Sequence, residues 1–197
     1  MKRIGLAGGI GSGKSLAAEK LISMGFGVID SDEVARRIVQ PGSKTLQTLV
    51  DAFGSAILTT GAELDRIYLA ELVFNDKGAL RRLNAITHPE IARMILDELD
   101  QSRSITMFVA LPLIRNEHRE IFNLDEIWVI ETSPAVAADR LVRFRKFTES
   151  QAWARIMNQP ANEERRKIAD RLIENNGDAD ELSLKIERLC RETDIVR

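Results

Sequence analysis

A glycine-rich stretch near the start of the chain, GGIGSGKS at residues 8–15, has the residue types and spacing of a phosphate-binding loop. Glycines let such a loop turn tightly and point its N–H groups at phosphate oxygens, and the helix expected after it adds a positive dipole end. Lys14 is expected to reach the β- and γ-phosphates of a nucleotide, and the Ser15 hydroxyl to help hold Mg²⁺. The predicted nucleotide-binding residues here are Gly8, Gly9, Ile10, Gly11, Ser12, Gly13, Lys14, Ser15 and Leu16.

Two carboxylates follow in VIDSDEVAR, residues 28–36. A carboxylate at the end of a strand can orient an acceptor hydroxyl and take its proton, while a second can hold a metal ion or metal-bound water. Asp32 and Asp30 are the candidates for these two roles. Capping of a helix that begins near Glu33 is the alternative, since Ser31 and Asp32 are both good N-cap types.

The elements that must position these residues alternate along the chain. Apolar runs predict strands, and segments of helical length and period separate them. The predicted strands are residues 3–7, 27–30, 104–111, 126–131 and 171–175. This order predicts an α/β fold of the P-loop type, a three-layer α/β/α core around a parallel sheet.

Two long stretches between strands are expected to form separate parts of a single domain. Residues 41–103 are too many for one crossover helix and predict a helical insertion over the ligand crevice, including a long helix over 76–100 with Pro89 inside it. Residues 140–166 are rich in arginine and helix formers and predict a mobile lid. The core would then be about 1–40, 104–139 and 167–197.

Composition limits the alternatives. The chain has 197 residues, 44% of them hydrophobic, so it can bury a sizeable core. Its 28 Lys and Arg balance 30 Asp and Glu, which argues against a nucleic-acid partner. Cys190 is the single cysteine, and we expect it to be a buried thiol in a reducing compartment. No signal peptide or membrane span is evident, so we expect a cytoplasmic protein with a small-molecule substrate.

Several motifs together resemble the dephospho-CoA kinase family, which transfers a phosphoryl group from ATP to the ribose 3′-hydroxyl of dephospho-CoA in the last step of coenzyme A biosynthesis. They are GGIGSGKS, VIDSDEVAR, the PG at 41–42, LNAITHP at 83–89, the PL at 112–113 and ADRLIENNG at 169–177. The match covers nearly the whole chain. It implies a nucleotide-binding core, a helical domain for the coenzyme A moiety and a lid, with ATP and Mg²⁺ as cofactors.

The resemblance also implies roles for single residues. Asp32 would be the general base, Lys14 and Arg140 would be catalytic, and Ser15 and Asp30 would hold the metal. Arg36, His88 and Pro112 would bind the acceptor, and Asn175, with Asn176, would lie near the adenine. Gln159 and Arg165 match the glutamine and the following arginine of the lid. A structural role for His88, and a solvated helix face for Arg140, are the alternatives.

Five positions depart from the family's pattern: Leu16, Ala70, Ala110, Asn116 and Phe144. At Leu16 the family usually carries a second hydroxyl, and at Phe144 a second lid arginine. Two other functions therefore stay open: a related nucleotide or small-molecule kinase, and a degenerate paralogue that binds ATP or coenzyme A and has a regulatory role. A monomer or small homo-oligomer is expected.

Overall fold

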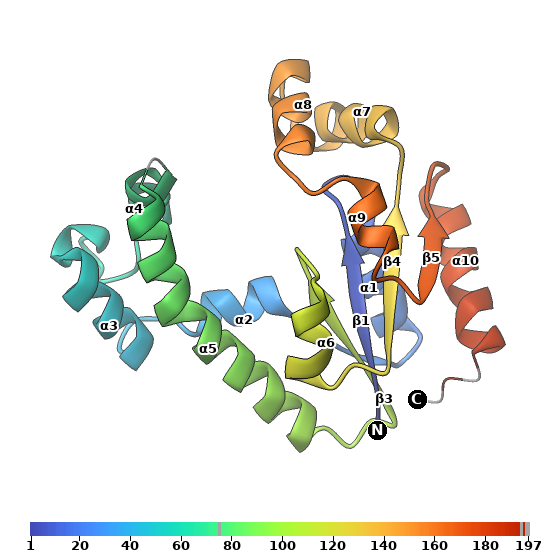
Figure 1. The fold of residues 1–197 in the computed structure, drawn as a ribbon, viewed down its shortest axis with the longest axis horizontal. Helices are drawn as coiled ribbons and strands as arrows, with labels where there is room; N and C mark the ends of the chain where they lie inside the picture. Colours follow the sequence, from blue (N-terminus) through green and yellow to red (C-terminus); the bar gives the residue numbers. More distant parts are fainter. Residues whose placement is uncertain (75, 194, 196–197) are drawn as a thin grey trace. The chain divides into compact units, whose positions relative to one another are not determined.

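The computed structural model, which describes residues 1–74, 76–193 and 195, contains a five-stranded parallel sheet (Figure 1). The strands are β1 (Lys2–Gly8), β2 (Gly27–Asp30), β3 (Thr106–Leu111), β4 (Glu126–Glu131) and β5 (Arg171–Glu174). Their order in the sheet is β2-β3-β1-β4-β5, and every neighbouring pair is parallel. The predicted strands and the α/β class are confirmed.

Helices cover both faces of this sheet. The helices α1 (Lys14–Ser23) and α10 (Ala179–Glu192) pack against each other and bury apolar residues of β1, β3, β4 and β5 in one cluster. Phe108 and Trp128 are fully buried there, with ring centroids 5.3 Å apart in an edge-on arrangement. The other face meets the segment with α6 (Asn116–Phe122), where Leu124 approaches the backbone of Gly5. The core is thus a three-layer arrangement.

Cys190 lies within the same cluster on α10 and is buried. Burial raises the pKa of its thiol to about 11, so the group stays protonated and packs as a small apolar side chain. The expected buried thiol is confirmed.

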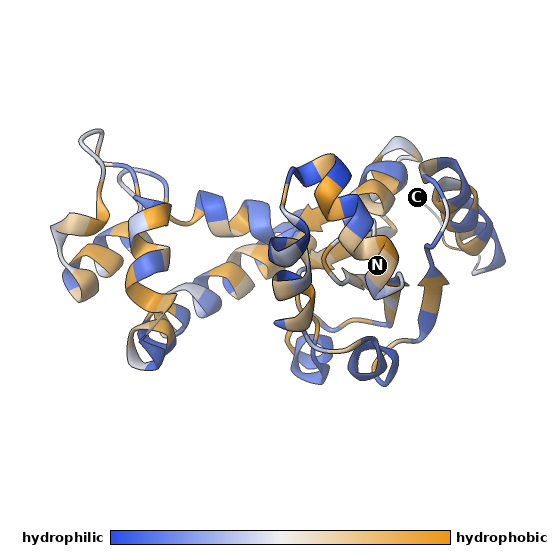
Figure 2. Cartoon of the chain, turned by 90° about the horizontal axis from the view of Figure 1, so that it is seen from above, coloured by the Kyte–Doolittle hydropathy of each residue, from blue (hydrophilic) through white to orange (hydrophobic). Residues whose placement is uncertain are grey.

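A second unit spans Ser31–Asp100, whereas the first comprises Met1–Asp30 and Gln101–Arg197. The second unit holds α2 (Ser31–Arg37), α3 (Lys44–Phe53), η1 (Ser55–Ile57), α4 (Arg66–Phe74) and α5 (Lys77–Gln101), the last ending one residue beyond it. The long helix expected over 76–100 is present as α5, with Pro89 inside. Helix α2 begins at Ser31, earlier than expected, so Asp32 lies in its first turn and not before it. Figure 2 shows hydrophobic and hydrophilic residues mixed along these helices.

The segment between β4 and β5 contains three helices. They are α7 (Pro134–Arg145), α8 (Glu149–Met157) and α9 (Asn162–Arg166). Ser133 and Thr148 cap α7 and α8 by accepting hydrogen bonds from backbone N–H groups, and α7 packs on α8. The lid boundary expected at residue 140 falls inside α7. The division into core, insertion and lid stays a prediction.

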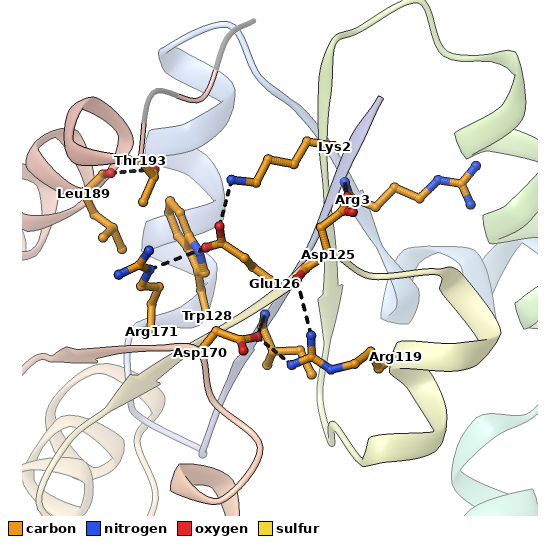
Figure 3. Close-up of polar contacts among 11 residues, drawn as sticks. Lys2, Arg3, Arg119, Asp125, Glu126, Trp128, Asp170, Arg171, Leu189 and Thr193 are labelled. Atoms are coloured by element: carbon orange, nitrogen blue, oxygen red, sulfur yellow. Dashed lines mark hydrogen bonds and ion pairs between the residues drawn. The ribbon is translucent and has the colours of Figure 1, made fainter.

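A network of polar side chains lies at the amino ends of β1 and β4 (Figure 3). Glu126 accepts a hydrogen bond from the Trp128 indole at 2.9 Å and pairs with Lys2 at 2.7 Å and Arg171 at 3.5 Å. Burial alone would raise the pKa of Glu126, but these hydrogen bonds and charges outweigh it and lower that pKa. The network links β1, β4 and β5 at the edge of the sheet opposite the glycine-rich loop.

No helix in the described part of the chain is both long and apolar enough to cross a lipid bilayer.

Candidate functional site

The glycine-rich loop lies between β1 and α1, at the carboxyl edge of the sheet. Gly11 and Gly13 have φ angles of 73° and 95°, in the left-handed region that glycine adopts without strain. Gly13 is also the N-cap of α1, and among the described residues no side chain caps the first N–H groups of that helix. Those groups are therefore available to an anion, as the motif predicts.

The side chains of Asn175 and Arg140 hold the backbone of the loop through hydrogen bonds to its carbonyl oxygens. The buried Asn175 amide donates to the Ser12 carbonyl oxygen at 2.7 Å, and its oxygen accepts from the Arg140 guanidinium at 3.3 Å. Arg140 also donates to the carbonyl oxygens of Gly11 at 3.1 Å and Gly177 at 2.6 Å. Burial lowers the pKa of Arg140 below its usual value. Both side chains fix the backbone of the loop, which favours a positioning role for each.

Ser12 is nearly fully buried, and its hydroxyl has no hydrogen-bond partner within the described residues. A Cβ at Gly8 would lie 2.3 Å from this Oγ and 2.9 Å from the Ile130 carbonyl oxygen, and the fixed backbone contact favours glycine at that position. The hydroxyl borders a cavity of about 30 Å³, which Gly9 and Arg165 also line and which has room for one or two waters.

Two side chains from the segment after α8 lie over the start of the loop. The Gln159 side-chain oxygen accepts a hydrogen bond from the Ile10 N–H at 2.8 Å. The Arg165 guanidinium approaches so closely that a Cβ at Gly9 would be 2.8 Å from its Nη2. Loop N–H groups of this kind are the usual donors to nucleotide phosphates, so both side chains border the expected phosphate site.

The position of Arg165 is fixed by contacts between α9 and the end of β4. Asn162 donates from its amide to the Thr132 carbonyl oxygen at 3.0 Å and accepts from Arg165 at 2.6 Å. One residue on, Arg166 forms a two-point ion pair with Glu131, whose side chain is only 7% exposed. This pair raises the pKa of Arg166. α9 is thereby anchored to the sheet.

A larger cavity of about 490 Å³ opens beside this anchor. Its lining includes Ser133, Pro134, Ile156, Met157, Glu174 and Asn176. A cavity of this size, with both apolar and polar residues in its walls, fits a group such as a nucleoside base or sugar.

The acidic segment begins at the same edge of the sheet. Asp30, the last residue of β2, is paired in register with Ala110 of β3, which in turn pairs with Leu6 of β1. Asp30 therefore lies at the same level of the sheet as Leu6, two residues before Gly8. Asp32 follows on α2 in the second unit, where its side chain is exposed.

The three predicted acceptor-binding residues are exposed, and the structure does not test their role. Arg36 lies on α2 and His88 on α5, whereas Pro112 follows β3 in the first unit. Their assignment stays a prediction.

The structure shows the environment of two residues that depart from the family's sequence pattern, Leu16 and Phe144. Leu16 packs against the main apolar cluster, so an apolar side chain is well placed there. Phe144 is 76% exposed on α7.

Comparison with known proteins settles the family. The family model for dephospho-CoA kinase matches residues 2–181. The chain belongs to the dephospho-CoA kinase family. It is 36% identical to the dephospho-CoA kinase of Thermobifida fusca (strain YX) over 192 residues, covering 98% of this chain and 96% of that protein. It is 39% identical to the one of Staphylococcus aureus (strain bovine RF122 / ET3-1) over 196 residues, covering 97% and 93%. The structure of the dephospho-CoA kinase from Campylobacter jejuni matches with a TM-score of 0.66 at 29% identity, over 97% of this chain and 96% of that one.

Membership of the dephospho-CoA kinase family makes the chain a kinase of coenzyme A biosynthesis that uses ATP and a small-molecule acceptor. Sequence reasoning found the loop residues and named Gln159 and Arg165 without a role. It missed the α9 anchor formed by Glu131, Thr132, Asn162 and Arg166. The sequence signal for this anchor was Glu131, an acidic residue at the carboxyl end of the apolar strand β4, because ligand-facing residues gather at that edge of the sheet.

Proposed function

We propose that this kinase transfers the terminal phosphoryl group of ATP to the ribose 3′-hydroxyl of dephospho-CoA through the residues around the glycine-rich loop. The observation that carries the proposal is the loop itself, with left-handed Gly11 and Gly13, uncapped N–H groups at the start of α1 and a buried support beneath. Family membership supplies the acceptor.

In this proposal the backbone N–H groups of residues 9–15 hold the phosphates, and Lys14 places its charge on the β- and γ-phosphates. Asp32 accepts the proton of the acceptor hydroxyl as that oxygen attacks the terminal phosphorus. Arg36, His88 and Pro112 bind the acceptor. We assign Asn175 to the support of the loop beside the adenine site, because both ends of its amide are engaged.

Ser15 and Asp30 are the proposed ligands of Mg²⁺. Their hydroxyl and carboxylate oxygens suit a hard cation, and Mg²⁺ commonly takes only one or two protein groups besides phosphates and waters. The described residues contain no cluster of three or more His, Cys, Asp or Glu side chains able to hold a metal by themselves, which fits a cation that arrives with the nucleotide. When bound, the cation would neutralise charge on the phosphates.

We further propose that the enzyme works in the cytoplasm as a monomer or small homo-oligomer. ATP is available there, and a single cysteine with a protonated thiol suits a reducing compartment.

The test is an ATP-consumption assay with and without dephospho-CoA, with the product identified as coenzyme A by mass. We expect ATP consumption that depends on dephospho-CoA. Nucleosides and nucleoside monophosphates serve as competing acceptors, and faster turnover of one of them would contradict the proposed acceptor. Nucleotide binding without transfer to any acceptor would contradict the proposed reaction.

A further inference from the structure

We propose that Arg165 is the arginine that contacts the terminal phosphate of ATP and stabilises its negative charge during transfer. This inference rests on the proposed transfer from ATP and assigns a catalytic role to a residue outside the loop.

The first support is the place of the guanidinium. It lies against the backbone of Gly9, where an added Cβ would be 2.8 Å from Nη2 and 3.3 Å from Cζ. Gly9 and the neighbouring Ile10 open the loop, whereas the N–H groups at the helix start serve the phosphates nearer the nucleoside. A cation at the beginning of the loop is therefore next to the terminal phosphate.

The second support is the unused bonding capacity of this side chain. Arg165 donates from Nη1 to the Pro160 carbonyl oxygen and from Nη2 to Asn162, both at 2.6 Å. Its Nε is buried and has no hydrogen-bond partner, and the side chain forms no ion pair within the described residues. Both Nε and the Ser12 hydroxyl, the other unpaired buried polar atom of the described chain, belong to residues that line the 30 Å³ cavity. Arg165 thus keeps a donor beside the loop that no protein group within the described residues satisfies.

Electrostatics agree with this assignment. Burial lowers the pKa of Arg165, and that effect outweighs the nearby charges of Glu131 and Glu163. Glu131 is already neutralised by Arg166. A partly buried guanidinium that keeps its charge without a carboxylate gains a strong partner when a phosphate binds.

The other arginines near the loop are engaged elsewhere. Arg140 donates to Gly11, Asn175 and Gly177, beneath the loop. Arg143 pairs with Asp139 at 2.8 Å, and its side chain is 69% exposed. Within the described residues, Arg165 is thus the arginine whose contacts bring it to the Gly9 backbone.

The covalent step is unchanged by this role. A bond forms from the acceptor oxygen to the terminal phosphorus, the bond from that phosphorus to the bridging oxygen of ADP breaks, and the hydroxyl proton goes to the base. Arg165 supplies charge and hydrogen bonds to the phosphoryl oxygens, and these strengthen as their charge rearranges in the transition state.

The experiment compares the full-length wild type with Arg165→Met, Arg165→Lys and the control Arg143→Met. For Arg165→Met we expect kcat to fall on the order of 10²–10³-fold. Affinity for a non-hydrolysable ATP analogue should fall while affinity for ADP stays within about twofold, measured by calorimetry. Arg165→Lys should recover part of kcat, because it keeps the charge but not the planar fork. Arg143→Met should stay within about twofold of the wild type.

A kcat of Arg165→Met within about threefold of the wild type, or an equal loss in Arg143→Met, would overturn the assignment. Thermal melting accompanies each variant. If the methionine variant does not fold, the lysine variant decides: a kcat reduced about tenfold at an unchanged melting temperature supports the role, and an unchanged kcat rejects it. Analogue binding needs no acceptor. Failure of the wild type to phosphorylate dephospho-CoA would thus count against the proposed function and leave the role of Arg165 testable.

Discussion

The side-chain oxygen of Gln159 accepts a hydrogen bond from the backbone N–H of Ile10 at 2.8 Å, although 149 positions separate the two residues. In a phosphate-binding loop this N–H is a natural donor to a phosphate oxygen. Gln159 therefore competes with the nucleotide for one donor of the loop.

Gln159→Ala is expected to tighten binding of a non-hydrolysable ATP analogue, because the terminal phosphate no longer has to displace the Gln159 amide from the Ile10 N–H. One neutral hydrogen bond is worth about 0.5–1.5 kcal/mol, so the gain should be roughly two- to twelvefold in Kd measured by calorimetry. Gln151→Ala is the matched control, since the Gln151 side chain accepts its hydrogen bond from the Thr148 N–H and caps α8. Unchanged or weaker binding of the ATP analogue in Gln159→Ala would show that the contact does not compete.

Asn175→Ala should destabilise the protein and weaken nucleotide binding together. The change leaves the Ser12 carbonyl oxygen and one Arg140 donor without their partner in a largely buried place. The expected cost is about 1–3 kcal/mol in the free energy of unfolding, measured with urea, with a lower ADP affinity. Asn116→Ala, at the exposed start of α6, should change neither quantity. Equal stability of Asn175→Ala and the wild type would contradict the supporting role.

Asp32→Asn tests the proposed base. Turnover with dephospho-CoA should fall about 10²–10⁴-fold, because asparagine cannot take the acceptor proton, while ADP affinity should stay close to that of the wild type. Asp51→Asn changes an exposed carboxylate of α3 that accepts a hydrogen bond from Gln47, and it should keep full turnover. A fully active Asp32→Asn enzyme would rule out this base.

Glu126→Gln tests the network at the amino ends of the strands. The lowered pKa of Glu126 means that its ionised form stabilises the fold above the usual carboxyl range, and that this contribution is lost as the pH falls through the lowered pKa. We expect Glu126→Gln to lose about 1–3 kcal/mol of unfolding free energy at pH 7, with the difference from the wild type shrinking as the pH approaches 3. The half-buried Glu187, paired with Lys20, provides the comparison, and Glu187→Gln should have little effect. A difference that is independent of pH would contradict the ionic explanation.

Much of the core could be predicted because its signals are local. The apolar run of β4, EIWVIE at 126–131, and the turn at Gly11 and Gly13 follow from neighbouring residue types, and the structure has both. Helix α6 was not predicted, because it is only seven residues long and so short a helix has little periodic signal. The start of α2 was placed too late, since Ser31 reads equally well as a cap or as a first-turn residue.

By itself the sequence determined the parallel α/β core, the phosphate-binding loop and the family, because each depends on short patterns whose geometry the local backbone enforces. Only the tertiary structure decided that Arg140 lies beneath the loop while Gln159 and Arg165 lie over its start. Each of these three side chains lies at least 129 positions along the chain from the loop residue that it contacts. Their placement depends on the anchoring of α9 to β4 through Asn162 and Arg166, a set of contacts that no local pattern encodes.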